Sequence, residues 1–150
     1  MRRSAAITIG LAAAFLGAFL ASSLFVDVPK TAVTHYLNGN DWSIRRFVGG
    51  RPYGTWVVWW PEAVPRHEQQ YERGRPSGRW RTISPRGVVL LERHYVDGEL
   101  EGPWTRRLED GTPVEEGSFA NGLRQGAWKH FDASGNLVSE TVYDRGRAQR

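Results

Sequence analysis

Four glutamates recur at a fixed spacing in this 150-residue chain, and a row of carboxylates is the first candidate for acid–base chemistry. They are Glu68, Glu92, Glu116 and Glu140, one every 24 positions. General acid–base catalysis needs a second titratable group beside the first, and no carboxylate or histidine recurs with them. An active site is also one place, whereas these are four equivalent places. We therefore expect each Glu to pair with Arg or Lys across strands, and we expect no catalytic residue and no enzyme activity.

The four histidines do not form a metal-binding pattern. They are His35, His67, His94 and His130, and no two of them lie two or four positions apart, the spacing that would start a zinc site. Cysteine is absent, which excludes a thiolate metal site, a disulfide framework and a lipid-modified cysteine. No Gly-x-Ser-x-Gly elbow occurs, and the closely spaced glycines precede no strand-to-helix junction that would hold a phosphate. The sequence therefore predicts no metal and no cofactor.

The charge is basic but unevenly distributed. The net charge is +4 and the isoelectric point is about 9.8. Residues 75–98 carry five Arg and two acidic side chains, whereas residues 99–122 carry two Arg and six acidic side chains. A nucleic-acid-binding stripe would be basic throughout. The alternation instead favours pairing between neighbouring segments or a bipolar protein partner, and it predicts no nucleic-acid partner.

One segment is unusually aromatic. Tyr53, Trp59 and Trp60 stand close together in a chain with seven Trp, six Phe and five Tyr. Aromatic side chains are enriched at protein interfaces, and they also stack on sugar rings. The three residues are therefore candidate contacts to a partner. The alternative is that they cover the end of a sheet, because monomers rarely expose large apolar patches.

These residues are positioned by a repeat. Four units of 24 residues span 51–74, 75–98, 99–122 and 123–146. The shared places are Gly at the fourth (Gly54, Gly78, Gly102, Gly126), Trp at the sixth (Trp56, Trp80, Trp104, Trp128), an aromatic at the twenty-first (Tyr71, Tyr95, Phe119, Tyr143) and a closing Gly (Gly74, Gly98, Gly122, Gly146). A fixed period in this range indicates a repeat architecture.

Each unit reads as a β-hairpin. In the fourth unit an aromatic run ends at Phe131, a Gly-bearing turn covers 132–135, and an alternating run follows at 136–143. The first unit has Pro61-Glu62-Ala63 in place of a Gly-bearing turn, so we expect its hairpin to be longer or looser. The predicted fold is all-β: an elongated, single-layer antiparallel meander of β-hairpin repeats. Rows of Trp and other aromatics are expected to stabilise it, since one layer buries no conventional core.

The segments outside the repeats have separate roles. Residues 1–26 hold an apolar run from 5 to 26 behind Arg2 and Arg3, and they are expected to form a hydrophobic helix that is either a cleaved signal peptide or a membrane anchor. Both readings place the repeats outside the cytoplasm, in the periplasm for a bacterial envelope protein. Residues 27–50 are expected to be a linker and a degenerate capping hairpin, out of phase because Gly39 and Gly50 are closer together than the repeat period. Residues 147–150 form a basic tail.

The repeat resembles a known family. Two motifs show the resemblance: Phe119-x-Asn121-Gly122-x-x-x-Gly126-x-Trp128 and Tyr95-x-Asp97-Gly98-x-x-x-Gly102-x-Trp104. They are similar to the MORN repeat, in the long bacterial MORN-variant form that includes antitoxin-like proteins. The resemblance implies an elongated hairpin array that acts as a protein-interaction or lipid-associated scaffold. The family has no shared catalytic residues, so the resemblance implies none here.

We therefore expect a non-enzymatic repeat scaffold, exported or membrane-tethered, that binds a protein partner through an elongated sheet face. Membrane association through residues 5–26 is part of this expectation. Two alternatives stay open: an envelope module that binds carbohydrate or lipid, and an antitoxin-like protein that sequesters an effector. The oligomeric state is also open, because the last strand (136–143) is an unpaired edge.

Overall fold

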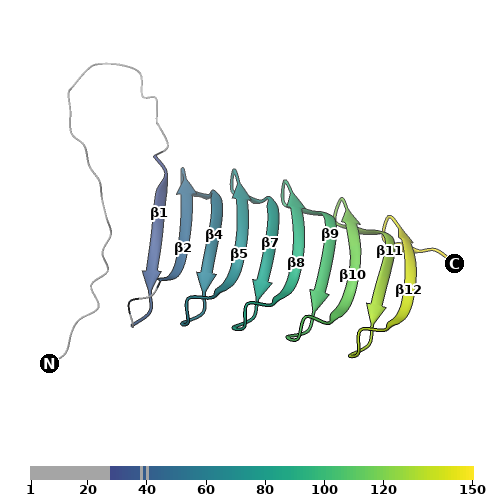
Figure 1. Ribbon diagram of the computed structural model, residues 1–150. Coiled ribbons are helices and arrows are strands. Elements are labelled where there is room, and N and C mark those ends of the chain that lie inside the picture. The colour runs from purple at the N-terminus through teal and green to yellow at the C-terminus, as the bar shows by residue number, and fades with distance from the viewer. Residues whose placement is uncertain (1–27, 38, 40) are drawn as a thin grey trace, which may run out of the picture.

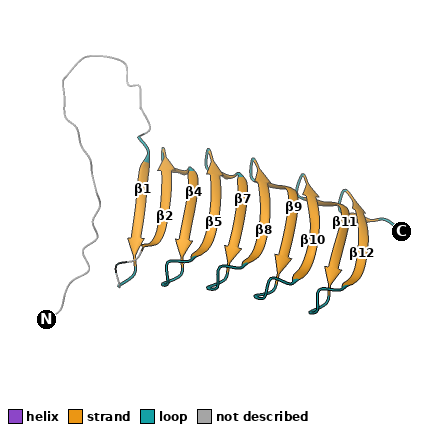
Figure 2. Ribbon diagram, viewed as in Figure 1, coloured by secondary structure: helices purple, strands orange, loops and turns teal. Residues whose placement is uncertain are grey.

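The described part of the chain is a single antiparallel β-sheet. The computed structural model describes residues 28–37, 39 and 41–150, and these form a 13-stranded sheet in which strands follow one another in chain order (Figure 1). Figure 2 shows only strands and loops among the described residues, and none of these residues forms a helix long and apolar enough to cross a membrane. The predicted all-β antiparallel meander is confirmed. The predicted helix in residues 1–26 lies outside the described residues.

Ten long strands and three short ones make up the sheet. Their bounds are β1 (Lys30–His35), β2 (Asp41–Val48), β3 (Arg51–Pro52), β4 (Gly54–Trp59), β5 (Pro65–Glu72), β6 (Arg75–Pro76), β7 (Gly78–Ile83), β8 (Val89–Val96), β9 (Glu99–Arg107), β10 (Pro113–Ala120), β11 (Leu123–Phe131), β12 (Leu137–Asp144) and β13 (Arg147–Ala148). The short strands β3 and β6 are the first two residues of a unit, separated from β4 and β7 by one residue. Each continues the antiparallel pairing with the strand before it.

Strands β1 and β2 add a hairpin in phase with the four units. The amide of Gly39 donates to the carbonyl of Tyr36 at 2.9 Å, as the amide of Gly87 does to the carbonyl of Ser84, two repeat periods later. The segment from Tyr36 is therefore the turn inside a hairpin. In sequence this segment resembles the end of a unit, such as Phe119 to Gly122, but its hydrogen bond places it inside a hairpin instead. The spacing of Gly39 from Gly50, which looked out of phase, is the spacing between the two turn glycines of an ordinary unit, such as Gly87 and Gly98.

The turns between units have a left-handed backbone at two consecutive residues. The first residue of each pair has a positive φ, and the second is the closing Gly: Arg73 (50°), Asp97 (50°), Asn121 (50°) and Arg145 (48°), followed by Gly74, Gly98, Gly122 and Gly146. Two positive φ values define the type I′ turn, whose twist matches that of antiparallel strands. This turn explains the Asn-Gly and Asp-Gly pairs of the sequence. Arg73 and Arg145 occupy the same conformation without the advantage of Asn or Asp.

The turns inside the units also share one geometry, including the first. The amide of Trp60 donates to the carbonyl of Val64 at 2.8 Å, and the amide of Ala63 donates to the carbonyl of Trp60 at 3.0 Å. The same two bonds form in the other units, where Gly occupies the place of Ala63. Ala63 takes the left-handed conformation with φ 61°. The expectation of a longer or looser first hairpin was therefore wrong: Ala accepts a strained φ because the rest of the turn fixes it.

The Gly-x-Trp motif has a hydrogen-bonding cause. Gly54 has a positive φ of 66°, which bends the chain between β3 and β4. The backbone amide of Tyr53 and the indole Nε1 of Trp56 then both donate to the carbonyl of Arg46, at 2.9 and 2.8 Å. The amide of Ser77 and the indole of Trp80 make the same pair of bonds to the carbonyl of Gln70, at 2.9 and 2.8 Å. In these two units, the glycine two residues before the Trp thus lets the indole bind the backbone of the preceding strand.

The two faces of the sheet differ in chemistry. Cross-strand partners share a face, and neighbours along a strand point to opposite faces. One row of partners runs Val33, Ile44, Val57, Glu68, Arg81, Glu92, Thr105, Glu116, Lys129 and Glu140; we name its side the ion-pair face. The row on the other side runs Thr34, Ser43, Val58, His67, Thr82, Leu91, Arg106, Glu115, His130 and Ser139, and the repeat Trp residues lie two positions from it; we name this side the aromatic face.

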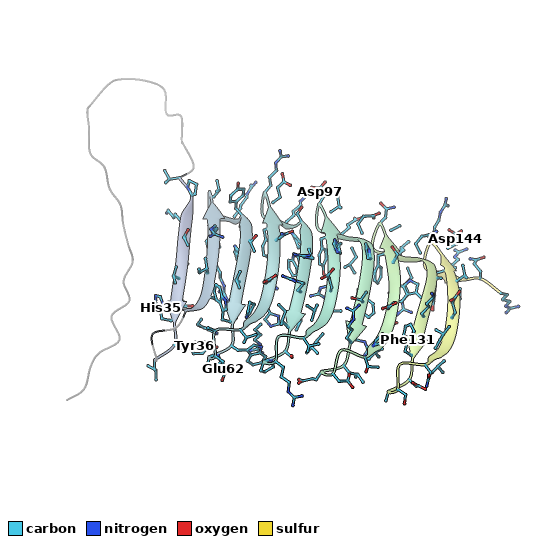
Figure 3. The ribbon with its side chains drawn as sticks, viewed as in Figure 1. His35, Tyr36, Glu62, Asp97, Phe131 and Asp144 are labelled. Atoms are coloured by element: carbon cyan, nitrogen blue, oxygen red, sulfur yellow. The ribbon has the colours of Figure 1, made fainter. Side chains whose placement is uncertain are left out.

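The turns divide between the two ends of the strands. Figure 3 places Asp97 and Asp144 at the end where units join, and Tyr36, Glu62 and Phe131 at the opposite end. No second layer covers either face in the described part of the chain (Figure 1). Among these residues only two hydrophobic side chains are buried, Ile83 and Trp128. The structure therefore depends on rows of half-buried side chains.

Candidate interaction surface

Aromatic rings form a continuous row over the first half of the aromatic face. Consecutive ring centroids lie 4.7 to 5.1 Å apart along Phe47, Trp56, Tyr71, Trp80 and Tyr95. These distances are in the range of favourable tilted aromatic pairs, each contributing about 0.5–1.5 kcal/mol beyond the area it buries. All five side chains remain half-buried. The predicted packing of each Trp on aromatics of neighbouring strands is confirmed for Trp56 and Trp80.

The row changes its partners in the third unit. Trp104 contacts Trp128 with centroids 5.3 Å apart, and Gly117 lies on the strand between them. A β-carbon on Gly117 would lie 2.3 Å from the Cδ2 atom of Trp128, so the missing side chain makes room for the two indoles to meet. Trp128 is fully buried and also packs edge-on against Phe119 at 5.0 Å. The aromatic row therefore reaches the C-terminal strands by a different set of contacts.

Three arginines lie over the repeat Trp rings of the aromatic face. The guanidinium of Arg45 lies 5.6 Å from the ring centre of Trp56, and that of Arg93 lies 5.6 Å from the ring centre of Trp80. Arg124 is closest, 4.0 Å from the ring centre of Trp128. Arg stacks on aromatic faces while its N–H donors stay available at the edge of the plane. The aromatic face therefore offers positive charge held in place by the rings.

A buried carboxylate lies beside the last indole. Glu115 is 7% exposed, and its Oε1 accepts a hydrogen bond from Arg124 at 3.0 Å. His130 Nε2 lies 3.1 Å from the same oxygen, and Arg106 lies 3.7 Å from Oε2. A buried carboxylate is tolerated when cations surround it, and removing one of them is destabilising. The cluster fixes Arg124 over Trp128 and is a structural ion-pair network.

Burial and nearby positive charge lower the pKa of a histidine on this face. The pKa of His67 is lowered from its ordinary value, first by burial and then by the positive charges of Arg66 and Arg93. Burial also raises the pKa of the Tyr71 hydroxyl, which the positive charge of Arg45 opposes. Both effects have the directions expected of groups that lie half-buried among guanidinium ions.

The recurring glutamates lie on the ion-pair face, where three of them pair across strands. Arg81 binds Glu68, with Nε donating at 2.9 Å. Glu116 lies 3.8 Å from Arg107, and Glu140 lies 4.0 Å from Lys129. The predicted pairing with Arg or Lys is confirmed for these three. The fourth, Glu92, instead contacts His94 of its own strand at 3.5 Å.

The predicted contact residues do not form one patch. Tyr53 is 49% exposed and lies before β4, whereas Trp59 and Trp60 are half-buried at the other end of that strand. The indole of Trp60 donates to the carbonyl of Ile83 at 3.0 Å, and Arg66 lies over its ring at 4.4 Å. Trp60 thus links its hairpin to the next one. These contacts explain a packing role for Trp60, and contact with a partner stays a prediction for all three residues.

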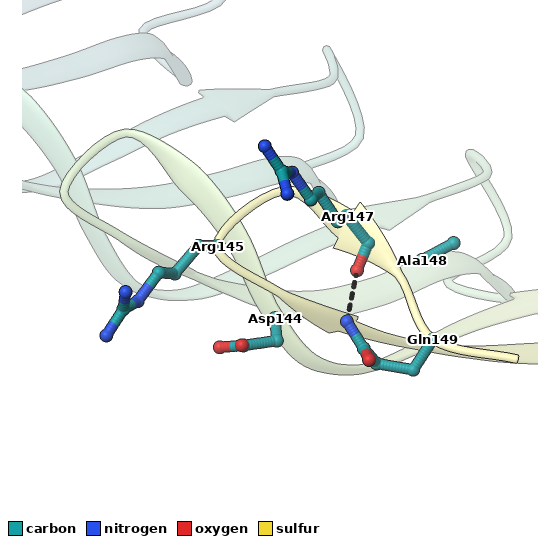
Figure 4. Close-up of a pocket in the computed structure, with 5 residues that line it drawn as sticks. All are labelled: Asp144, Arg145, Arg147, Ala148 and Gln149. Carbon is teal, nitrogen blue, oxygen red and sulfur yellow. Dashed lines mark hydrogen bonds between the residues drawn. The ribbon is translucent and has the colours of Figure 1, made fainter.

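Two shallow hollows are polar. The first lies between the first two units and is lined by Tyr53, Gln70, Glu72 and Ser77, among others. The second, at the C-terminus, is lined by Asp144, Arg145, Arg147, Ala148 and Gln149, with Gln149 donating to the carbonyl of Arg147 at 3.1 Å (Figure 4). Its lining comes from a single terminal turn. In the part of the chain that the structure describes, no three His, Asp or Glu residues are placed to bind a metal ion.

Sequence reasoning missed the arginines and the glutamate of the aromatic face. Arg45 and Arg93 occupy the same place of the repeat, two periods apart, and comparing that place across hairpins would have found them. Nothing in the spacing indicates Glu115 or Arg124, which meet only across strands. No protein-family model matches the chain, and no curated protein matches it. Function is therefore inferred from the chemistry of the two faces.

Proposed function

We propose that this protein is a non-enzymatic scaffold, exported or membrane-tethered, that binds a protein partner through its aromatic face. One observation carries the proposal: a one-layer sheet leaves a row of Trp and Tyr rings half-exposed along one face. Aromatic side chains with Arg are enriched in the centres of protein interfaces. A partner that covers the row would bury apolar area that the chain alone leaves in contact with water.

The shape of the surface supports binding over catalysis. Sites for small substrates are concave and enclose most of the ligand, whereas the aromatic face extends over successive hairpins. Ten long strands at about 4.8 Å spacing span about 43 Å, a length suited to an extended polypeptide. The resemblance to the MORN repeat, whose members act as scaffolds, agrees with this proposal.

The ion-pair face provides a matched control for the test. Thr82 and Thr105 are both half-buried strand residues, the first on the aromatic face and the second on the ion-pair face. A photo-crosslinking amino acid placed at either position, in the full chain expressed in cells, would report what lies against each face. We expect a discrete polypeptide adduct from position 82 and none from position 105, as resolved by gel shift and mass spectrometry.

The alternatives predict different adducts. Adducts at position 82 that contain lipid or envelope polysaccharide, with no polypeptide, would replace the proposal by a lipid- or carbohydrate-binding module. Equal adducts from both positions would show that neither face is selective, which contradicts a dedicated surface. The same crosslinking is repeated under mildly denaturing conditions, with unfolding monitored by circular dichroism. Loss of the adduct as the sheet unfolds would show that the crosslink requires the folded sheet.

The proposed location is tested separately. We expect the mature chain in the envelope fraction, either with its N-terminus shortened by removal of the leader or full-length and sedimenting with membranes. The measurement is the intact mass of the native protein after fractionation. A full-length chain in the cytoplasmic fraction would contradict export.

A further inference from the structure

We propose that the partner segment bound by the aromatic face is an acidic polypeptide, extended across the strands. This inference rests on the proposed function and names the chemistry of the partner. The rows of the aromatic face carry four arginines, Arg45, Arg93, Arg106 and Arg124, against one carboxylate, Glu115. Arg106 and Arg124 share that single carboxylate. The face therefore has an excess of positive charge.

Arg45 and Arg93 are the two arginines of the aromatic face that lie over rings away from Glu115; Arg66, which lies over Trp60, projects to the opposite side of the sheet. Within residues 42–150, no carboxylate lies at ion-pair distance from either guanidinium. Arg93 stacks over Trp80 and also lies 5.7 Å from the ring centre of Tyr95. The pKa of His67 is lowered first by burial and then by the positive charges of Arg66 and Arg93, which agrees with this environment. A carboxylate of the partner could form a charge-assisted, bidentate pair of hydrogen bonds with either guanidinium.

The opposite face mixes both signs of charge. Three of its four recurring glutamates lie at ion-pair distance from Arg81, Arg107 and Lys129. The exposed Arg46, Arg66 and Arg79 also lie on this face, so it has six cations against these four carboxylates, whereas the aromatic face has four arginines against one. An acidic segment that approached this face would meet carboxylates as well as cations, and the repulsion would offset the attraction. Charge complementarity therefore selects the aromatic face.

The positions of the arginines set the length of the segment. Arg45 lies on β2 and Arg93 on β8, four strands further along the sheet, and Arg124 lies on β11 after three more. At about 4.8 Å per strand these intervals are about 19 and 14 Å. An extended polypeptide advances about 3.3 Å per residue, so about ten residues would pass all three arginines. Apolar side chains between the acidic ones would contact the rings.

A polypeptide fits this arrangement better than a lipid surface does. The guanidinium groups lie 4.0–5.6 Å from the centres of the rings they cover, so they belong to the sheet face itself. Cations that bind a bilayer electrostatically need to approach the plane of lipid headgroups together. Stacked, separated guanidiniums are instead suited to individual carboxylates on a narrow chain.

The test uses labelled peptides and one matched pair of charge reversals. Three labelled twelve-residue peptides would repeat Glu-Ser, Gln-Ser or Lys-Ser, each with one central Phe. Fluorescence anisotropy would measure how tightly each peptide binds to the full-length protein. The variants are Arg93→Glu on the aromatic face and Arg79→Glu on the ion-pair face; Arg79 is exposed and adjacent to Trp80 along β7. Both variants change the net charge equally. Arg93→Gln removes the charge without reversing it and keeps the test open if Arg93→Glu unfolds.

We expect only the Glu-Ser peptide to bind, with affinity that falls as salt rises. Arg93→Glu should weaken it about tenfold or more, Arg93→Gln by an intermediate factor, and Arg79→Glu less than twofold. Equal loss for Arg93→Glu and Arg79→Glu would show a net-charge effect and overturn the inference. If the Glu-Ser peptide does not bind and the protein instead associates with vesicles of anionic lipid, the inference is overturned in favour of a lipid surface.

The crosslink at position 82 separates this inference from the proposed function. A polypeptide adduct whose crosslinked segment lacks acidic residues would overturn the acidic chemistry and leave the scaffold proposal standing. Absence of any polypeptide adduct would overturn the scaffold proposal, whatever the Glu-Ser peptide does in solution.

Discussion

A single β-carbon distinguishes the first repeat turn from the others. Ala63 has φ 61° where Gly87, Gly111 and Gly135 have φ between 80° and 89°. The left-handed conformation costs a residue with a β-carbon about 1 kcal/mol relative to Gly. The flanking hydrogen bonds are the same in all these turns, so the turn forms in spite of this cost.

Ala63→Gly should therefore stabilise the protein. We expect an increase of about 0.5–1 kcal/mol in the free energy of unfolding, reduced somewhat because Gly also increases the freedom of the unfolded chain. Urea denaturation followed by Trp fluorescence measures it. Ala133→Gly is the control, because Ala133 lies in the corresponding turn of the fourth unit and is not among the residues with positive φ. A gain at both positions would contradict the conformational explanation.

The charge of His67 makes stability depend on pH. Its pKa in the folded protein lies below the ordinary value of 6.5, so the unfolded state binds the proton more tightly. The contribution to stability is complete above the unfolded pKa and is lost as pH falls through about 6.5 towards the folded pKa. We expect the urea midpoint to fall between pH 7.5 and 5.5, and His67→Gln to flatten that slope. An unchanged slope would show that the other titrating groups determine it.

At the scale of the element, Gly117 is required by its neighbours in the sheet. It has no positive φ, so the reason for glycine is space: Trp128 lies on it, and Trp104 is its cross-strand partner. This glycine lies inside β10 and outside the turn positions that the repeat marks. Its role follows from side chains on two adjacent strands.

Gly117→Ala should disturb the contact between the two indoles. The added β-carbon would overlap with the Trp128 ring, and overpacking of this kind costs about 1–3 kcal/mol. We expect lower stability and a changed near-ultraviolet circular dichroism spectrum, which reports indole packing. In a Trp128→Leu background the same substitution should cost less, because the smaller side chain leaves room. An equal cost in both backgrounds would point to an effect on the strand backbone.

The indole hydrogen bonds predict a difference between equivalent tryptophans. Trp80 donates to the carbonyl of Gln70, whereas Trp104 is turned towards Trp128. Trp80→Phe should therefore destabilise the protein by about 0.5–1 kcal/mol more than Trp104→Phe, because it removes one hydrogen bond, while the amide of Ser77 still donates to the same carbonyl. Thermal unfolding of both variants gives the comparison. The reverse order would show that ring packing outweighs the hydrogen bond.

At the scale of the molecule, stability should vary along the sheet. Every residue of β1 is exposed, and β12 is exposed at all but two residues, whereas β7 to β10 are mostly half-buried or buried. In a repeat array each unit contacts only its neighbours, so the terminal strands have support on one side. The two edges should therefore open more easily than the centre.

Hydrogen exchange tests this gradient. We expect amides of β7 to β10 to exchange most slowly and those of β1 and β12 to exchange fastest, as followed by mass spectrometry of peptic fragments. A binding partner added at saturation should slow exchange across several strands if it crosses the aromatic face. Uniform protection from β1 to β12 would show one cooperative unit and contradict nearest-neighbour stability.

The sequence alone determined the hairpin meander. In a meander each strand pairs with the next, so the repeat period and the turn residues at its two ends settle which strands are neighbours and where each turns. Gly74, Gly98 and Gly122 lie in turns that require their positive φ values. The predicted cross-strand pairing is confirmed for Glu68, Glu116 and Glu140, but not for Glu92. The sequence was ambiguous from Tyr36 to Gly50. Glycines mark both the turns inside units and the turns between units, and in a degenerate unit the sequence does not tell the two kinds apart.

Only the tertiary structure decided which chemistry each face carries. Glu115, Arg106 and Arg124 are brought together by irregular pairing on both sides of β10, where the register shifts by one residue against β9 and by two against β11. Such shifts change which side chains share a face or lie opposite one another. The contact of Trp104 with Trp128 likewise depends on the space above Gly117. A period specifies where side chains recur along the chain, whereas their orientation and contacts across the sheet arise only when the strands are paired.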